Sequence, residues 1–597
     1  MSDTPAGKAQ SGDFLSNLGR IYGWYTGGFV GFVVVLGILE QLGVPNRIIG
    51  YLFVFLTIGV YALIGYLSRT AQVSEYYVAG RRVPAFYNGM ATGSDWMSAA
   101  SFIGMAGTLY LLGYDGLAFV LGWTGGYVLV AILLAPYLRK FGAYTVPDFL
   151  GARYGGNLAR FCGVIVLMSA SFTYVVAQIY GTGIIASRFL GISFELAVFV
   201  GLAGILVCSM LGGMRAVTWT QVAQYIILII AYLVPVVLLS AEVTGVPVPQ
   251  IMYGQALEQI EVLRTTKEAL AGAPSHTQPF TTYDPLNFFG LIFCLMVGTA
   301  SLPHILMRYF TTPSVRDARQ SVAWSLFFIF LLYFTAPAYA AFAKLEVFTN
   351  VIGAPIASLP EWVNIWSNIG LVRVADANGD GILQFREFTI NADAIVLATP
   401  EIAGLPYVIA GLVAAGGLAA ALSTADGLLL AIANALSHDI YYRMIDPKAN
   451  AKRRLVVARI LLVLVAIVAA WVASTRPAGI LAMVAWAFSI AASGLFPALV
   501  MGVWWKRTTA AGAVAGMVAG YGVCLFYLIG TQYYAMPLWF GVRNISCGLF
   551  GIPVAFFVTV VVSLMTPAPS RAMQDFIDSI RTPRGGVRLV AGEKALD

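Results

Sequence analysis

Apolar residues along the chain fall into long blocks that short polar stretches separate. A helix needs about 20 mostly apolar residues to cross the hydrocarbon core of a bilayer. Fourteen blocks approach or exceed this length, and the pattern predicts an all-α, polytopic transmembrane helix bundle; if 25–43 lies on the membrane surface, thirteen spans remain. The predicted spans are 25–43, 47–67, 84–113, 116–138, 157–189, 191–212, 218–241, 286–306, 321–346, 403–437, 455–476, 478–504, 508–530 and 544–566.

The composition supports the membrane assignment. Hydrophobic residues make up 59% of the chain and charged residues only 11%, with a mean hydropathy of +0.81, whereas soluble proteins average about 45–50% and about 25%. A soluble fold could not cover so much apolar surface. Five cysteines, none in a CxxC pair, lie in or beside apolar blocks, so neither a disulfide nor a metal site is expected. The polar N-terminus does not predict a cleavable signal peptide.

The net charge of +7 arises from basic residues in the loops, which indicates membrane orientation rather than a nucleic-acid partner. With the N-terminus in the cytoplasm and sides alternating, most of the 35 Lys and Arg residues fall on the cytoplasmic side. We therefore expect both termini to be cytoplasmic, including the terminal basic residues Lys8, Arg584, Arg588 and Lys594. The long loops 242–285, expected to form a partly helical cap, and 347–402 then lie outside.

The third predicted span, NGMATGSDWMSAASFIGMAGTLY (88–110), is unusually polar. Glycines with small hydroxyl residues permit a helix break whose freed carbonyls can bind a cation. Close packing through small residues would also explain the glycines, but not the costly charge of Asp95. The polar and small residues are Gly89, Thr92, Gly93, Ser94, Asp95, Ser98, Ser101, Gly104 and Gly107.

The tenth span carries AAALSTADGLLLAIANALSHDIY (419–441). Ser423 and Thr424 offer two hydroxyl oxygens and Asp426 a carboxylate, which suit a hard cation. The alternative is that both hydroxyls bond to carbonyls of their own helix.

The eighth span, NFFGLIFCLMVGTASLPHILMRYFTTP (287–313), is interrupted by Gly298, Thr299, Ser301 and Pro303. His304 follows the interruption, as a proton carrier, a substrate contact or a hydrogen-bonded structural histidine. We expect Arg308 to extend to the cytoplasmic surface.

The segment DANGDGILQFRE (376–387) matches the twelve-residue calcium loop of EF-hands at each diagnostic position. Gly381 makes the turn and Leu383 is the hydrophobic anchor. The predicted Ca²⁺ ligands are Asp376, Asn378, Asp380, Ile382 through its carbonyl, Gln384 and Glu387. A polar turn of similar composition is the alternative.

Three segments resemble the sodium:solute symporter family and, within it, bacterial cation–acetate symporters. They are EYYVAGRRVPAFYNGMATGSDWMSAASFIGMAG (75–107), GTASLPHILMRYFT (298–311) and LSTADGLLLAIANALSHDIY (422–441). The resemblance spans roughly 45–560 and implies a leucine-transporter-like fold with two inverted five-helix repeats, 84–241 and 286–504. The N-terminus with two leading helices (1–83), two trailing helices (505–566) and a cytoplasmic tail (567–597) complete the expected organisation.

The resemblance also implies a sodium site. Its ligands would be the carbonyls of Ser94, Met97 and Ala420 and the hydroxyls of Ser423 and Thr424. The proline-permease branch has an aspartate where this chain has Trp96, so the role of the neighbouring Asp95 is open. The residues expected to meet the substrate are Asp95, Ser98, Thr299, Ser301 and His304.

The predicted function is import of a small monocarboxylate such as acetate, coupled to Na⁺, across a bacterial inner membrane by alternating access. A sodium symporter for proline or another carboxylate, and a nutrient sensor with a transporter fold, are the alternatives. No constellation of catalytic residues predicts an enzyme. The expected partners are the organic anion and the lipid bilayer, with a small membrane subunit left open.

Overall fold

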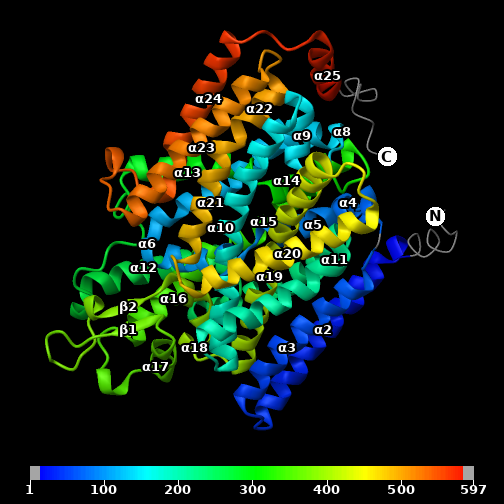
Figure 1. Ribbon diagram of the computed structural model, residues 1–597. Helices are drawn as coiled ribbons and strands as arrows, with labels where there is room; N and C mark the ends of the chain where they lie inside the picture. Colours follow the sequence, from blue (N-terminus) through cyan, green and yellow to red (C-terminus); the bar gives the residue numbers. More distant parts are fainter. Residues whose placement is uncertain (1–13, 71, 583–597) are drawn as a thin grey trace.

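The protein is a helical bundle with one small β-hairpin (Figure 1). A computed structural model describes residues 14–70 and 72–582. The predicted basic residues Lys8, Arg584, Arg588 and Lys594 lie outside this range. Among the described residues, eleven helices are long and apolar enough to cross a membrane, or twelve if the bent pair α13–α14 counts as one span.

The first half of the bundle begins with a helical hairpin and continues through a broken helix. Its elements are α2 (Leu18–Gln41), α3 (Asn46–Leu67), α4 (Val73–Val78), α5 (Ala85–Trp96), α6 (Met105–Leu112), α7 (Leu117–Leu129), α8 (Ala135–Phe141), α9 (Val146–Tyr154), α10 (Asn157–Leu190), α11 (Phe194–Thr244) and α12 (Pro249–Thr266). The helix α12 confirms the partly helical cap expected in 242–285.

The second half contains the second broken helix and the β-hairpin. Its elements are α13 (Pro285–Thr299), α14 (Pro303–Tyr309), α15 (Val315–Tyr333), α16 (Ala336–Asn350), α17 (Glu361–Asn368), β1 (Val372–Val374), β2 (Phe388–Ile390), α18 (Ala392–Ile402), α19 (Tyr407–Asn434), α20 (Ala451–Ser474), α21 (Ile480–Gly494), α22 (Phe496–Trp504), α23 (Ala510–Tyr533), α24 (Gly548–Met565) and α25 (Arg571–Arg581). The strands pair antiparallel, with Val372 opposite Ile390.

The count differs from the fourteen predicted spans because three of them do not stand as separate long helices. The predicted span 286–306 is the bent pair, and 191–212 corresponds to the shorter apolar helix Phe194–Leu206. One segment, Ala100–Phe141, meets the length and hydropathy of a single span and covers parts of two predicted spans. It is interrupted at Gly113, whose φ of 58° breaks the helix before α7.

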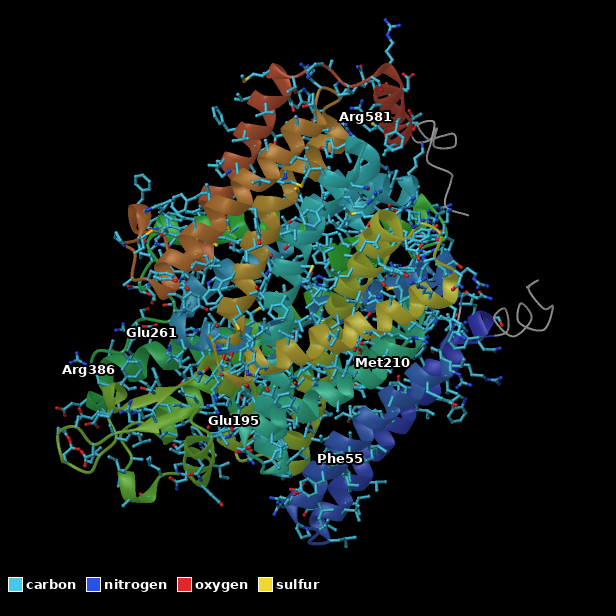
Figure 2. The ribbon with its side chains drawn as sticks, in the orientation of Figure 1. Phe55, Glu195, Met210, Glu261, Arg386 and Arg581 are labelled. Carbon is cyan, nitrogen blue, oxygen red and sulfur yellow. The ribbon has the colours of Figure 1, made fainter. Side chains whose placement is uncertain are left out.

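The two described ends of the chain lie at the same end of the bundle. The start of α2 and the helix α25 are on the right and upper side of Figure 1, whereas β1, β2 and α17 lie at the lower left. Figure 2 likewise separates Arg581 of α25 from Glu261 of α12 and Arg386 near the hairpin. The loop 376–387 therefore lies at the opposite end from α25.

The helix α19 forms the centre of the bundle, between α10 and α11. Alanine and glycine dominate its first half, and small residues allow helix backbones to approach closely in membranes. A Cβ atom added to Gly416 would lie 2.3 Å from the Cβ of Ala231 on α11. This close packing fixes the position of Ser423 and Thr424, which follow on the same helix.

Candidate functional site

The first helix break lies between α5 and α6. Met97, which follows α5, has φ −74° and ψ 69°, outside helical values. The helix resumes through a π-helical turn, Ala100–Gly104. The side chain of Gln178 on α10 accepts a hydrogen bond from the backbone N–H of Ala99 at 2.8 Å. This contact satisfies a backbone group that the break exposes, and it confirms the break predicted in 84–113.

The second break lies between α13 and α14, which are bent by 46°. Pro303 begins α14, where the missing N–H has no intrahelical partner to lose. Both predicted interruptions are therefore present, and both bring non-helical backbone into the buried interior.

Five oxygen atoms gather where α19 passes the first break. The Ser423 hydroxyl donates to the Ser94 carbonyl at 2.8 Å and lies 2.9 Å from the Ala420 carbonyl. The Thr424 hydroxyl donates to the Asp95 carbonyl at 2.7 Å and lies 3.3 Å from the Ala420 carbonyl. Ser94, Asp95, Ser423 and Thr424 are all fully buried.

This oxygen set fits Na⁺, because carbonyl and hydroxyl oxygens are suitable ligands for a hard cation. Four of the five predicted ligand residues meet here: Ser94, Ala420, Ser423 and Thr424. Thr424 contacts the carbonyl of Asp95 where the resemblance had implied Met97. Met97 lies two residues further along, at the break itself, and stays a prediction as a ligand.

The side chain of Asp95 forms an ion pair with Arg308 of α14. The Arg308 Nε donates to the Asp95 carboxylate at 2.9 Å, and both side chains are fully buried. The guanidinium also donates to Thr218 of α11 at 3.2 Å. The expectation that Arg308 extends to the cytoplasmic surface is wrong: the bend before α14 turns this residue toward the first break, where a carboxylate offsets its charge.

The other predicted substrate residues are divided between satisfied and unsatisfied groups. The hydroxyls of Thr299 and Ser301 donate to carbonyls of their own helix, at 2.7 Å and 2.9 Å. Neither ring nitrogen of the buried His304 has a hydrogen-bond partner among the described residues. Its ring packs edge-on against Tyr174 of α10, with centroids 5.6 Å apart. Ser98 lies buried in the break.

Aromatic side chains form a packed group beside His304, which we call the aromatic cluster. Tyr174 contacts Phe488 of α21 at 5.9 Å between centroids, and Phe488 contacts Trp96 at 5.5 Å. The Trp96 indole N–H donates to the hydroxyl of Tyr333 at 2.7 Å. Aromatic side chains of this kind suit contact with the apolar part of a small substrate.

A second buried charged group lies near the end of α19. We call Asp148 of α9 with Arg160, His438, Asp439 and Arg443 the Asp148 cluster. Ligand atoms of Asp148, His438 and Asp439 lie within 4.8 Å of one another, as in a metal site. His438 and Asp439 belong to a π-helical continuation of α19, Ala435–Ile445.

The predicted calcium loop, 376–387, connects β1 to β2 and adopts the turns that its motif requires. Gly379 and Gly381 have φ of 75° and 71°, and Leu383 is fully buried. The Asp376 carboxylate accepts hydrogen bonds from the N–H groups of Gly379 and Gly381, at 2.9 Å and 3.2 Å. The Asn378 and Gln384 amides both donate to Asp380, and Glu387 accepts from the N–H of Ala377 and Gln384.

A cavity of about 670 Å³ lies elsewhere. Its lining includes Arg47, Arg188, Glu361 and Glu401, at the end of the bundle that carries α17. Arg188 and Glu401 form an ion pair across it at 2.5 Å. The cavity therefore does not reach the residues of the two breaks.

Sequence reasoning missed the Asp95–Arg308 pair and the Asp95 carbonyl. A signal was available: an arginine four residues after His304 in an interrupted apolar segment is costly unless it has a partner. The sequence could not identify that partner, because 213 residues separate Asp95 from Arg308.

Comparison with known proteins places these features in context. A family model described as the sodium:solute symporter family matches residues 76–365 and 369–520. An uncharacterized symporter of Cupriavidus necator is 47% identical, with 95% of this chain and 99% of the relative covered. The solved structure of a Na⁺-coupled sialic acid symporter in a substrate-bound outward-open state has a TM-score of 0.67. The two sequences are 17% identical, and the match covers 88% of this chain and 99% of the chain in that structure.

Proposed function

Because the chain belongs to the sodium:solute symporter family, whose leucine-transporter-like fold it shares, we propose that it imports a small monocarboxylate such as acetate, driven by Na⁺. The oxygen cluster of Ser94, Asp95, Ala420, Ser423 and Thr424 carries the proposal for Na⁺. It joins a broken helix to the central helix α19, so a bound cation would hold these two elements together.

Coupling follows from that connection. Na⁺ at the oxygen cluster would order the first break, and the ordered break would complete the substrate site formed by Ser98, His304 and the aromatic cluster. We assign the two inverted repeats to 84–241 and 286–504, so the two breaks are equivalent elements of the repeats. Rocking of one group of helices against the other would then expose both sites to the opposite side.

The decisive experiment measures uptake of labelled acetate into proteoliposomes with and without an inward Na⁺ gradient. We expect accumulation only with the gradient, and competition by other short monocarboxylates. Sodium-driven uptake of proline instead of acetate would identify proline as the substrate. Uptake of neither compound would favour a ligand sensor.

We propose a bacterial inner-membrane location with α25 in the cytoplasm and loop 376–387 outside. A cysteine at Gly379 in a cysteine-free background should react with an impermeant thiol reagent added to intact cells, and one at Lys448 should not. The reverse pattern would invert the orientation.

We also propose that loop 376–387 binds Ca²⁺ through Asp376, Asn378, Asp380, the Ile382 carbonyl, Gln384 and Glu387. The N–H of Ile382 and the Asn378 amide lower the pKa of Asp380, so this carboxylate is charged at neutral pH and available to a cation. Repulsion among the three carboxylates without a cation, and its relief by Ca²⁺, supports a stabilising role.

Millimolar Ca²⁺ should raise the melting temperature of chelator-treated protein, since a hundredfold excess over Kd stabilises by about 2.7 kcal/mol. Glu387→Gln should reduce this rise, whereas Glu268→Gln, on an exposed residue outside the loop, should not. The same melting temperature with Ca²⁺ and with chelator would show that the loop is a polar turn that does not bind Ca²⁺.

A further inference from the structure

Arg308 is the most deeply buried cation near the two breaks. Its side chain is fully buried and lies on α14, beyond the second break, against Asp95 before the first. A buried charge in a membrane protein is costly and commonly serves function. An ion pair alone does not repay desolvation unless the remaining donors and acceptors are satisfied as well.

The donors of Arg308 are not all satisfied. A guanidinium carries five N–H groups. The Nε–H donates to Asp95, and Nη1 donates to Thr218 and to the sulfur of Met214. Nη2, which carries two N–H groups, has no hydrogen-bond acceptor among the described residues. Asp95 and Arg308 are joined by one hydrogen bond, whereas arginine and carboxylate commonly form two parallel ones.

His304 lies four residues before Arg308, so the two share a face of α14. Both of its ring nitrogens also have no partner in the described part of the chain. Leaving buried donors without acceptors is unfavourable. A small anion with two acceptor oxygens would accept hydrogen bonds from Arg308 Nη2 and from the single N–H of a neutral His304 ring.

We propose that Arg308 binds the carboxylate of the substrate through Nη2, with His304 as a second donor. This inference rests on the proposed function and adds the residue that selects for a carboxylate. The aromatic cluster of Trp96, Tyr174 and Phe488 would contact the short apolar part of the substrate.

Asp95 has a distinct part in this arrangement. It already neutralises Arg308, so an arriving carboxylate brings a second negative charge to the break. The carbonyl of the same Asp95 belongs to the oxygen cluster, where Na⁺ would balance that charge. The anion and Na⁺ therefore favour each other's binding.

The test compares opposite changes to the ion pair in the sodium-driven uptake assay. Asp95→Asn removes the carboxylate that competes for Arg308, and it should lower the half-saturating acetate concentration and weaken its dependence on Na⁺. Arg308→Lys, which keeps the charge but loses the planar fork, should raise that concentration about tenfold or more. Equal changes in the same direction for both variants would mean a structural ion pair and overturn the inference.

A second variant guards against misfolding. Arg308→Gln combined with Asp95→Asn leaves no unpaired buried charge, so we expect it to fold and to keep Na⁺-dependent thermal stabilisation. Acetate should no longer raise its melting temperature at saturating Na⁺, as it should in wild type. Arg153→Gln is the matched control, because every acceptor of the buried Arg153 among the described residues is a backbone carbonyl, of Gly502, Trp505 or Thr508.

The outcomes separate the two proposals. If the double variant responds to acetate like wild type, the role of Arg308 is refuted while symport stands. If wild type shows neither uptake nor an acetate-dependent shift, the proposed function itself fails and the inference fails with it.

Discussion

Two regions of the protein bury aspartate against arginine, and they differ in how many cationic side chains lie within ion-pair distance of the carboxylate. At the helix breaks, Asp95 and Arg308 share one hydrogen bond, and Arg308 Nη2 and His304 remain without partners among the described residues. In the Asp148 cluster, the Asp148 carboxylate lies 3.4 Å from Arg160, 3.5 Å from Arg443 and 3.5 Å from His438.

The remaining cluster contacts complete a charge network. Asp439 accepts a hydrogen bond from Thr145 at 2.7 Å and lies 3.6 Å from Arg160. Burial raises the pKa of Asp148, but His438, Arg443 and Arg160 outweigh burial and bring the pKa below its usual value. The carboxylate is thus charged at neutral pH and held by its own cations.

The helix breaks have the features of a binding site, whereas the Asp148 cluster, made of the same residue types, has those of a structural ion-pair network. The Asp148 cluster has metal-ligand spacing, but a metal-bound histidine donates its other N–H to an acceptor. Here Nδ1 of His438 lies 3.1 Å from the Arg454 guanidinium, which can only donate. Adding a divalent cation beside three arginines would concentrate positive charge. The helix breaks, where Arg308 pairs with a single carboxylate, are therefore the better ligand site.

The largest effect is expected at the oxygen cluster. Ser423→Ala combined with Thr424→Ala should abolish sodium stimulation of uptake with little volume change, because it removes two of the five oxygen ligands. Thr531→Ala is the control, since this hydroxyl bonds only within its own helix α23. Unchanged sodium dependence in the double variant would remove the site assignment.

The next largest effect concerns the stability of the Asp148 cluster. Arg160→Gln leaves buried carboxylates short of a cation, which typically costs about 3–5 kcal/mol. We expect a clear drop in melting temperature in detergent, with an unchanged half-saturating acetate concentration. Lys452→Gln, at an exposed position of α20, should leave both unchanged. A changed half-saturating acetate concentration without a drop in melting temperature would show that the cluster is a binding site.

Asp393 of α18 shows how burial changes the pKa of a carboxyl group that is not paired with any arginine that the structure describes. It is buried, and burial, only partly offset by the N–H of Ile480, raises its pKa to about 6. The folded protein then holds a proton that the unfolded chain releases near pH 4. Stability should fall as pH rises from 4 to 6, by at most about 3 kcal/mol.

Melting temperatures between pH 4 and 7 would measure this decline, and Asp393→Asn should remove the part due to this group. Glu268→Gln, at an exposed position, serves as the control. An equal slope in wild type and in Asp393→Asn would contradict the prediction.

The smallest expected effect is that of zinc on the Asp148 cluster. Added Zn²⁺ should not raise the melting temperature of wild type more than that of His438→Gln. A rise in melting temperature that requires His438 would show that the Asp148 cluster is a metal site. Both regions would then be ligand sites.

Much of the fold followed from the sequence alone. Apolar blocks longer than a bilayer crossing predicted the helices, because lipid leaves the backbone few alternatives. Glycine, serine and proline in two of the blocks predicted both breaks. The motif at 376–387 predicted its turns, since ligand spacing and glycine positions within a twelve-residue loop are local properties. The ligand set around Ser423 and Thr424 came from resemblance to a family, and the structure brings four of its five residues together.

What only the tertiary structure decided is which charges meet. The positive-inside rule counts arginines by their position relative to apolar blocks, so Arg308 looked like a loop cation. The bend before α14 carries it instead to Asp95, 213 residues earlier in the chain. Asp439 is likewise brought to Arg160 and Asp148 by packing between helices distant in sequence. The sequence around a charged residue shows that burying it is costly. The partner that offsets this cost depends on packing between segments that are remote in sequence.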